Sequence, residues 1–235
     1  MPKAIKKKVS KKELDAGIDV QDRIQDIKKV FEKKQKTLAA YGLITLSAVI
    51  VIGGIAVYRF NAKAKAQQLE YAAYKTYYNL YQKTPLSGQE KAGKALELYQ
   101  QAYEKRKSPR LLLSIADAYA ELSKDDEALK TLEDFTKRFA REETLVPLAL
   151  QKMAGIQIRK GNTAEALKTL DRIAAAPGDM LKDVVLVEKA RMLEKEGKKD
   201  EAAALYEELT KKYPTSPYIE EAKGKTGEKK TGEKS

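Results

Sequence analysis

The sequence contains no cysteine, no histidine and no tryptophan. Without cysteine the chain cannot form disulfides or use a thiol nucleophile, and without histidine it cannot build an imidazole-based catalytic triad. The same two absences exclude zinc sites that use cysteine or histidine ligands. Carboxylate chemistry remains open in principle. The lack of thiols is compatible with an oxidising or a reducing compartment.

The net charge of +12 is unevenly distributed along the chain. Residues 1–37 carry a net charge of +6, residues 59–110 carry +7, and residues 111–223 carry −3. Residues 38–58 contain no charged side chain. A nucleic-acid-binding domain has a basic face of its own, whereas the positive charge here flanks an uncharged segment. We therefore expect no nucleic-acid partner.

The uncharged segment is TLAAYGLITLSAVIVIGGIAVY, residues 37–58. As an α-helix its 22 residues would rise about 33 Å, against a hydrocarbon core of about 30 Å. A cleaved signal peptide is the alternative, because Ala62-Lys63-Ala64 resembles a cleavage site. The 36 preceding residues and the length of the apolar run favour a retained transmembrane helix.

Residues 1–36 precede this span and contain twelve Lys and Arg residues. Because such residues are enriched on the cytoplasmic side of a membrane, we expect this tail in the cytoplasm and the rest of the chain outside. Residues 1–12, MPKAIKKKVSKK, are predicted to be disordered. Asp19 is then predicted to cap a short amphipathic helix with Val20, Ile24, Ile27 and Phe31 on one face. This helix either leans on anionic lipid headgroups or docks a cytoplasmic partner.

The six residues EALKTL occur at 127–132 and again at 165–170, 38 positions apart, and a weaker copy lies around Glu201. Self-similarity at such a period indicates a repeated helical hairpin. In each copy one alanine lies twelve residues before another, so that two antiparallel helices can approach closely. These pairs are Ala116 and Ala128, Ala154 and Ala166, and Ala190 and Ala202. Stacked hairpins would form a solenoid.

The spacing over residues 109–217 resembles the tetratricopeptide repeat. Tyr119 and Pro214 stand where that repeat has its usual tyrosine and closing proline. The sequence also departs from the pattern: Gln157 and Leu193 replace the tyrosine, and Lys189 replaces an apolar residue. Large residues stand where the second helix usually has a second alanine, and the periods of 38 and 36 residues are longer than usual. The predicted fold class is all-α, with one N-terminal transmembrane helix followed by a tetratricopeptide-like solenoid of helical hairpins.

Residues 59–108 are predicted to form a linker helix and a partial first repeat. The linker helix would cover residues 64–82, with a loop around Pro85 and Gly88 before the next helix. We expect four tyrosines of the linker helix to pack against that next helix, or alternatively to contact a ligand: Tyr71, Tyr74, Tyr78 and Tyr81. Residues 218–235 end in GKTGEKKTGEKS and are predicted to be disordered.

The resemblance to tetratricopeptide repeats implies a partner-binding groove, because the first helix of each hairpin lines the concave side. The residues assigned to it are Arg110, Leu113, Asp117 and Glu121, then Gln151, Lys152, Gly155 and Arg159, then Val187, Arg191, Glu194 and Lys195. Some relatives grip a peptide C-terminus with a Lys/Asn clamp, but Gln151, Gly155 and Asp117 cannot serve as one. We therefore expect weak, micromolar binding of extended or partly unfolded segments.

The whole layout resembles the YfgM-like family, mainly in YGLITLSAVIVIGGIAVYRFNAKAKAQQLEYAAY and the repeats after it. This resemblance implies a bacterial inner-membrane protein with a single span and a periplasmic repeat domain. Its partners would be subunits of the SecYEG translocon, periplasmic chaperones or unfolded clients.

No catalytic residue, cofactor site or metal site is expected, since acidic pairs such as Asp125/Asp126 lie at turns or on polar faces. Two alternatives remain open. One is a scaffold for another envelope assembly, such as cytochrome maturation or outer-membrane biogenesis. The other is a membrane-tethered nucleic-acid or lipid binder that uses the basic tail.

Overall fold

The computed structural model describes residues 11–81, 84 and 86–226 of the chain, and none of these residues forms a strand. The all-α prediction is therefore confirmed. The chain divides into two compact units, residues 1–61 and residues 62–235, which we describe separately. The helices are α1 (Lys11–Tyr77), α2 (Gly88–Lys105), α3 (Pro109–Glu121), α4 (Asp125–Arg138), α5 (Leu145–Arg159), α6 (Thr163–Ala174), α7 (Lys182–Lys195), α8 (Lys199–Lys212) and α9 (Ile219–Thr226).

The first unit consists of helix α1 up to Asn61. Its most apolar stretch has a mean hydropathy of 2.2, and none of that stretch is buried within the protein. The hydroxyls of Thr45 and Ser47 donate hydrogen bonds to the carbonyls of Gly42 (2.9 Å) and Leu43 (2.8 Å). These polar side chains therefore need no partner from outside the helix. The helix is long and apolar enough to cross a membrane.

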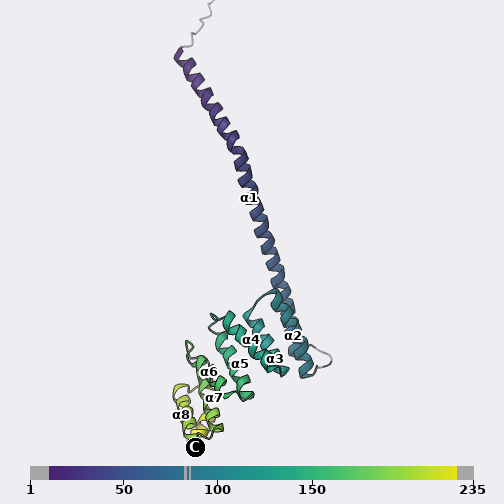
Figure 1. The fold of residues 1–235 in the computed structure, drawn as a ribbon, viewed down its shortest axis with the longest axis vertical. Helices are drawn as coiled ribbons and strands as arrows, with labels where there is room; N and C mark the ends of the chain where they lie inside the picture. Colours follow the sequence, from purple (N-terminus) through teal and green to yellow (C-terminus); the bar gives the residue numbers. More distant parts are fainter. Residues whose placement is uncertain (1–10, 82–83, 85, 227–235) are drawn as a thin grey trace, which may run out of the picture. The chain divides into compact units, whose positions relative to one another are not determined.

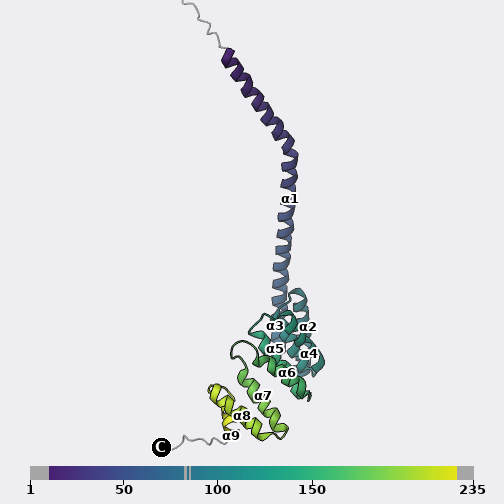
Figure 2. The same cartoon turned by 60° about the vertical axis from the view of Figure 1, so that its left-hand side comes forward.

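The start of α1 differs from the prediction. The helix begins at Lys11, so Asp19 lies inside it and does not cap it. Residues 11–16 are mostly strong helix formers, which extend a helix without a dedicated cap. The prediction of disorder for residues 1–12 is wrong at Lys11 and Lys12, which belong to α1, and residues 1–10 lie outside the described residues. Figure 2 shows that α1 bends once in its N-terminal half.

The second unit contains the three predicted hairpins, α3–α4, α5–α6 and α7–α8, packed one after another (Figure 1). All six alanines of the repeat register are at most 2% exposed. Most of the apolar residues spaced three and four positions from them are also buried, including Leu132, Phe135, Leu170 and Ile173, while Leu186 is partly buried. The helical register read from the repeats is therefore confirmed.

Each hairpin turns at one residue with a left-handed backbone. These residues are Ser123 (φ 57°), Gly161 (φ 77°) and Gly197 (φ 79°), each shortly after the first helix of its pair. Glycine adopts this conformation without a steric penalty and commonly ends helices for that reason. Ser123 adopts it in the first hairpin, where no glycine is available.

At two positions that depart from the tetratricopeptide pattern, the polar side chain has a partner on a neighbouring helix. Gln157 is buried, and its Oε1 accepts a 2.8 Å hydrogen bond from the hydroxyl of Thr169 on α6. Lys189 forms a 2.5 Å ion pair with Asp171, so its charge is neutralised between α6 and α7. A buried polar group is tolerated when it has such a partner.

The linker helix ends at Tyr77, earlier than predicted. Asn79 has a left-handed backbone (φ 53°). Its side-chain amide both donates to the carbonyl of Leu86 (3.0 Å) and accepts from its N–H (3.2 Å). These two hydrogen bonds join the start of the loop at Asn79 to its end at Leu86. Ser87 and Glu90 then form a capping box, so Gly88 lies in α2 rather than in the loop.

The prediction that the linker tyrosines pack against α2 is wrong. Tyr71, Tyr74, Tyr78 and Tyr81 are all exposed, at 58%, 47%, 56% and 90%. The buried face of this part of α1 carries Ala66 and Ala73, with Leu69 and Tyr77 partly buried beside them. These residues follow a helical spacing of three or four, and the small alanines allow a close approach that tyrosines on that face would prevent.

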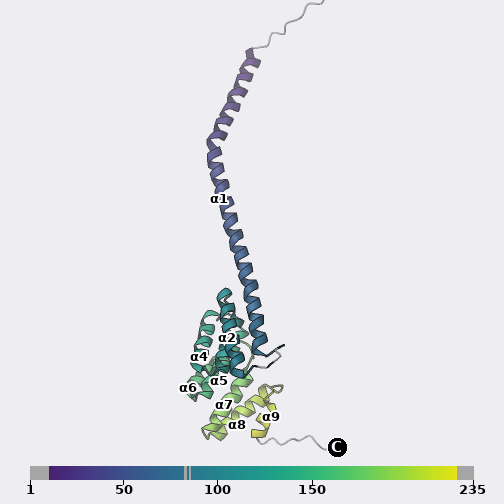
Figure 3. The same cartoon turned by 90° about the vertical axis from the view of Figure 1, so that its right-hand side faces the viewer.

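Part of the predicted disordered tail is also helical. Residues 219–226 form α9, which lies beside α8 (Figure 3). Ala222 is fully buried in a cluster with Val187, Ala190, Tyr206 and Leu209. The helix forms because this apolar contact stabilises a segment too short to be helical alone. Residues 227–235 lie outside the described part of the chain.

Candidate functional site

Two adjoining cavities lie on the face formed by α5 and α7. One, of about 450 Å³, is lined by Ile158, Met192 and the polar side chains of Glu188, Arg191, Glu194 and Lys195. The other, of about 440 Å³, is lined by Gln151, Lys152, Ala154, Gly155, Ile158, Leu170, Val184, Glu188 and Tyr218. Because they share Ile158 and Glu188, we treat them as one groove, the α5–α7 groove.

The α5–α7 groove has an apolar floor and a polar rim. Ala154, Leu170, Val184 and Met192 are all at least 90% buried and form the floor. Both cavities are within the size range of about 300–1,000 Å³ that is usual for ligand sites. Apolar floors with polar rims bind side chains of an extended segment while leaving its backbone free to form hydrogen bonds.

Gly155 keeps part of this groove open. It is exposed in the middle of α5, and a Cβ built at this position meets no atom within 4 Å. A glycine in a helix interior costs about 0.5–1 kcal/mol relative to alanine. No turn, close approach or left-handed backbone requires it here. The missing side chain leaves open space in the groove.

Six of the twelve residues predicted for the groove line it: Gln151, Lys152, Gly155, Arg191, Glu194 and Lys195. Two others are buried and cannot line an open surface. Leu113 is 8% exposed, because α3 is covered on several sides by its neighbours, and Val187 is 0% exposed. Val187 packs in the cluster that includes α9, which the sequence prediction had treated as disordered.

The remaining four predicted residues lie outside the two cavities. Arg110 and Glu121 are exposed on α3. Asp117 forms a 2.7 Å ion pair with Lys152, which links α3 to α5 at the edge of the groove. Burial and then the negative charges of Glu121 and Asp117 raise the pKa of Tyr77 to about 12.

Arg159, the fourth, points back to the first hairpin. Its guanidinium forms a 2.5 Å ion pair with Asp125 at the start of α4. The next residue, Lys160, pairs with Asp126 in the same way. The two pairs join the turn of the second hairpin to the turn of the first, so the guanidinium of Arg159 is directed toward the first hairpin rather than into the two cavities.

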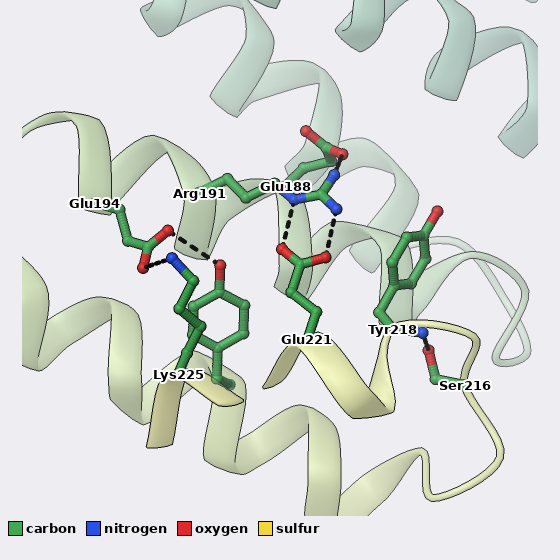
Figure 4. A network of polar contacts seen from close by, with 8 residues as sticks. Glu188, Arg191, Glu194, Ser216, Tyr218, Glu221 and Lys225 are labelled. Atoms are coloured by element: carbon green, nitrogen blue, oxygen red, sulfur yellow. Dashed lines mark hydrogen bonds and ion pairs between the residues drawn. The ribbon is translucent and has the colours of Figure 1, made fainter. Parts of the chain in front are cut away.

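Arg191 is held in a network between α7 and α9 (Figure 4). Its Nε and Nη2 donate to both carboxylate oxygens of Glu221 at 2.8 and 2.6 Å, and its Nη1 donates to Glu188 at 2.7 Å. The hydrogen bonds from Arg191 hold the pKa of Glu221 below its usual value. Glu194 pairs with Lys225 of α9 at 2.7 Å. Arg191 and Glu194 therefore fasten α9 to α7.

The sequence prediction missed Tyr218, which precedes α9 and lines the groove. Its ring lies 5.5 Å from the guanidinium carbon of Arg191, within the range of a cation–π contact. The signals were present but weak: Pro217, two acidic residues in the first turn, and apolar Ile219 and Ala222 three residues apart.

The described residues include no cluster of three or more acidic side chains that could hold a metal ion. Several charged groups of the groove are held in ion pairs: Lys152 with Asp117, Arg191 with Glu188 and Glu221, and Glu194 with Lys225. This arrangement suits the binding of a polypeptide segment.

Comparison with known proteins identifies the family of the chain. No curated protein matches the chain. Among solved structures, the crystal structure of the MamA protein is similar over 59% of this chain and 77% of its own, with 17% sequence identity and a TM-score of 0.44. The family described as a tetratricopeptide repeat-like domain matches residues 38–221. That match covers more than half of the chain and all three hairpins, so the chain belongs to the tetratricopeptide repeat-like family.

Proposed function

We propose that the chain is a membrane-anchored scaffold that holds extended or partly unfolded protein segments in the α5–α7 groove. Tetratricopeptide repeat-like domains generally bind proteins and are generally not catalytic. The observation that carries the proposal is the pair of adjoining cavities on one face. Their floor accepts apolar side chains, and the amide of Gln151 at the rim suits hydrogen bonds with a backbone.

The charged rim favours weak binding. Lys152, Arg191 and Glu194 are already paired with Asp117, Glu221 and Lys225. A partner that engages them must displace an existing ion pair, so it gains little from charge. Binding then depends on apolar contact with the floor and on backbone hydrogen bonds. We expect affinities in the micromolar range or weaker, which suits transient contact with unfolded segments.

We further propose that residues 37–58 cross a bacterial inner membrane once, with the N-terminus in the cytoplasm and the groove in the periplasm. The twelve Lys and Arg residues in residues 1–36 support this orientation. The resemblance to the YfgM-like family supports a role beside the SecYEG translocon. The partners would then be translocon subunits, periplasmic chaperones or emerging clients.

Site-specific crosslinking in membranes tests the proposal. A photo-crosslinking amino acid replaces Gln151 in the groove and, as a control, Lys168, which is exposed on the far side of α6. We expect emerging secretory chains or translocon subunits to crosslink at position 151 and not at position 168.

Two other results would contradict this. Equal crosslinking at both positions, or none at either, would place the contact outside the groove. Crosslinking at position 151 to proteins of cytochrome maturation or outer-membrane biogenesis would keep the groove as the site but overturn the assignment to the translocon.

A further inference from the structure

The N-terminal part of α1 has an apolar face that no other described residue of the chain covers. Ile24, Ile27, Val30 and Phe31 are each more than half exposed. Ile27, Val30 and Phe31 line an open hollow of about 350 Å³ between Asp26 and Lys34. At about 100° per residue, these side chains lie along one stripe of the helix. Such a stripe is unfavourable in water and requires a partner.

Lysines border this stripe. Lys28 and Lys33 lie at its two edges, and Lys34 lies at its C-terminal end, with about 100° between successive residues. Within the described residues, none of these three lysines forms an ion pair. Lys29, on the opposite side of the helix, pairs with Asp26 at 3.7 Å. The three lysines without an ion pair therefore lie around the apolar stripe.

We propose that this face of α1, residues 24–34, lies flat on an anionic lipid surface. Apolar side chains would enter the boundary between headgroups and acyl chains, and the bordering lysines would contact lipid phosphates. A second copy of the chain fits less well, because it would place the same lysines against one another. An anionic leaflet is complementary in charge.

The position of the face in the chain supports a lipid partner. The apolar segment 37–58 begins three residues after Lys34 in the same helix. If that segment crosses the membrane, as proposed above, residues 24–34 are held at its surface. Figure 2 shows a bend in the N-terminal half of α1, so the part of the helix before the bend is inclined to the part after it. The inference rests on the proposed membrane anchoring, and the experiment below separates the two.

The absence of cysteine allows single-site labelling of the full chain. The full-length protein is reconstituted in vesicles of phosphatidylcholine, with or without phosphatidylglycerol. An environment-sensitive fluorophore is attached in variants Ile27→Cys on the face, Lys29→Cys on the opposite side, and Ile50→Cys within the span. With phosphatidylglycerol present, we expect the fluorophore at position 27 to report an apolar environment and to be quenched by quenchers carried on the lipids. The fluorophore at position 29 should remain in water.

Replacing Lys28, Lys33 and Lys34 by Gln should weaken docking by about fivefold for each lysine, because each basic residue near an anionic surface adds a similar increment. An aqueous label at position 50 would overturn the membrane anchoring. A buried label at 50 with aqueous labels at both 27 and 29 would overturn the lipid docking alone. Close pairing of spin labels at position 27 would assign the face to a second copy. Burial of that label only after addition of cytosol would assign it to a soluble protein.

Discussion

Substitutions at Gly155 can change the stability of the repeat domain and the open space in its groove independently. We predict that Gly155→Ala stabilises the chain and that Gly155→Leu blocks the groove without destabilising the fold. The residue is exposed in a helix interior, and a Cβ at this position has open space around it. The two substitutions change only what protrudes from α5.

The magnitudes follow from the local geometry. Gly155→Ala should add about 0.5–1 kcal/mol, since alanine loses less backbone entropy on entering a helix. In a unit of this size that corresponds to a rise in Tm of about 1–4 °C. Gly155→Leu places four side-chain carbons in the cavity beside Gln151 and Lys152. If it displaces about two buried methylenes of a bound segment, affinity falls about tenfold.

The assay pairs two measurements on the full chain. Thermal unfolding of the detergent-solubilised protein reports stability, and the yield of crosslinks from position 151 in membranes reports occupancy of the groove. Gly93 in α2 provides a matched control, because it is also a helical glycine whose added Cβ meets nothing within 4 Å, but it does not line the groove. Gly93→Leu should leave the crosslinks unchanged.

Two results would refute the reasoning. A lower Tm for Gly155→Ala would mean that this glycine does not face open space. An unchanged crosslinking yield for Gly155→Leu, with the fold intact, would mean that partners bind elsewhere.

Four further predictions concern the fold and the topology. Ser123→Gly should raise stability by up to about 1 kcal/mol in thermal melts, because Ser123 has a left-handed backbone. Ala166→Leu should lower it by about 1–3 kcal/mol through overpacking of a fully buried position, and an unchanged melt would contradict the register. The pKa of Glu221 is lowered from 4.5, so its contribution to stability is present above that value and is lost as pH falls through the lower folded-state pKa. In the Glu221→Gln variant, the free energy of unfolding should therefore decrease less steeply as the pH is lowered. Protease added to spheroplasts should digest residues 62–235, and survival of this unit until membrane lysis would invert the topology.

The sequence alone was enough for the features that depend on nearby residues. Alanines twelve residues apart, such as Ala154 and Ala166, predicted the hairpins, because helical period and small side chains act within one pair of helices. The sequence also predicted that segment 37–58 is long and apolar enough to cross a membrane, because this property depends only on the length and composition of the segment. Half of the predicted groove residues, including Gln151 and Lys195, line it because the repeat register places them on one face.

Only the tertiary structure decided which apolar faces are covered and by what. An amphipathic pattern shows that a face is apolar, but it does not identify the neighbour. Leu113 and Val187 are therefore buried although they match the groove register, and Tyr74 is exposed although it lies on an aromatic stripe. The bond from Arg191 to Glu221 joins residues 30 positions apart, and it forms because α9 is too short to be stable until it docks on α7 and α8. That docking places Tyr218 in the groove. The local sequence gives only weak signals for α9, and it does not show which helices α9 packs against.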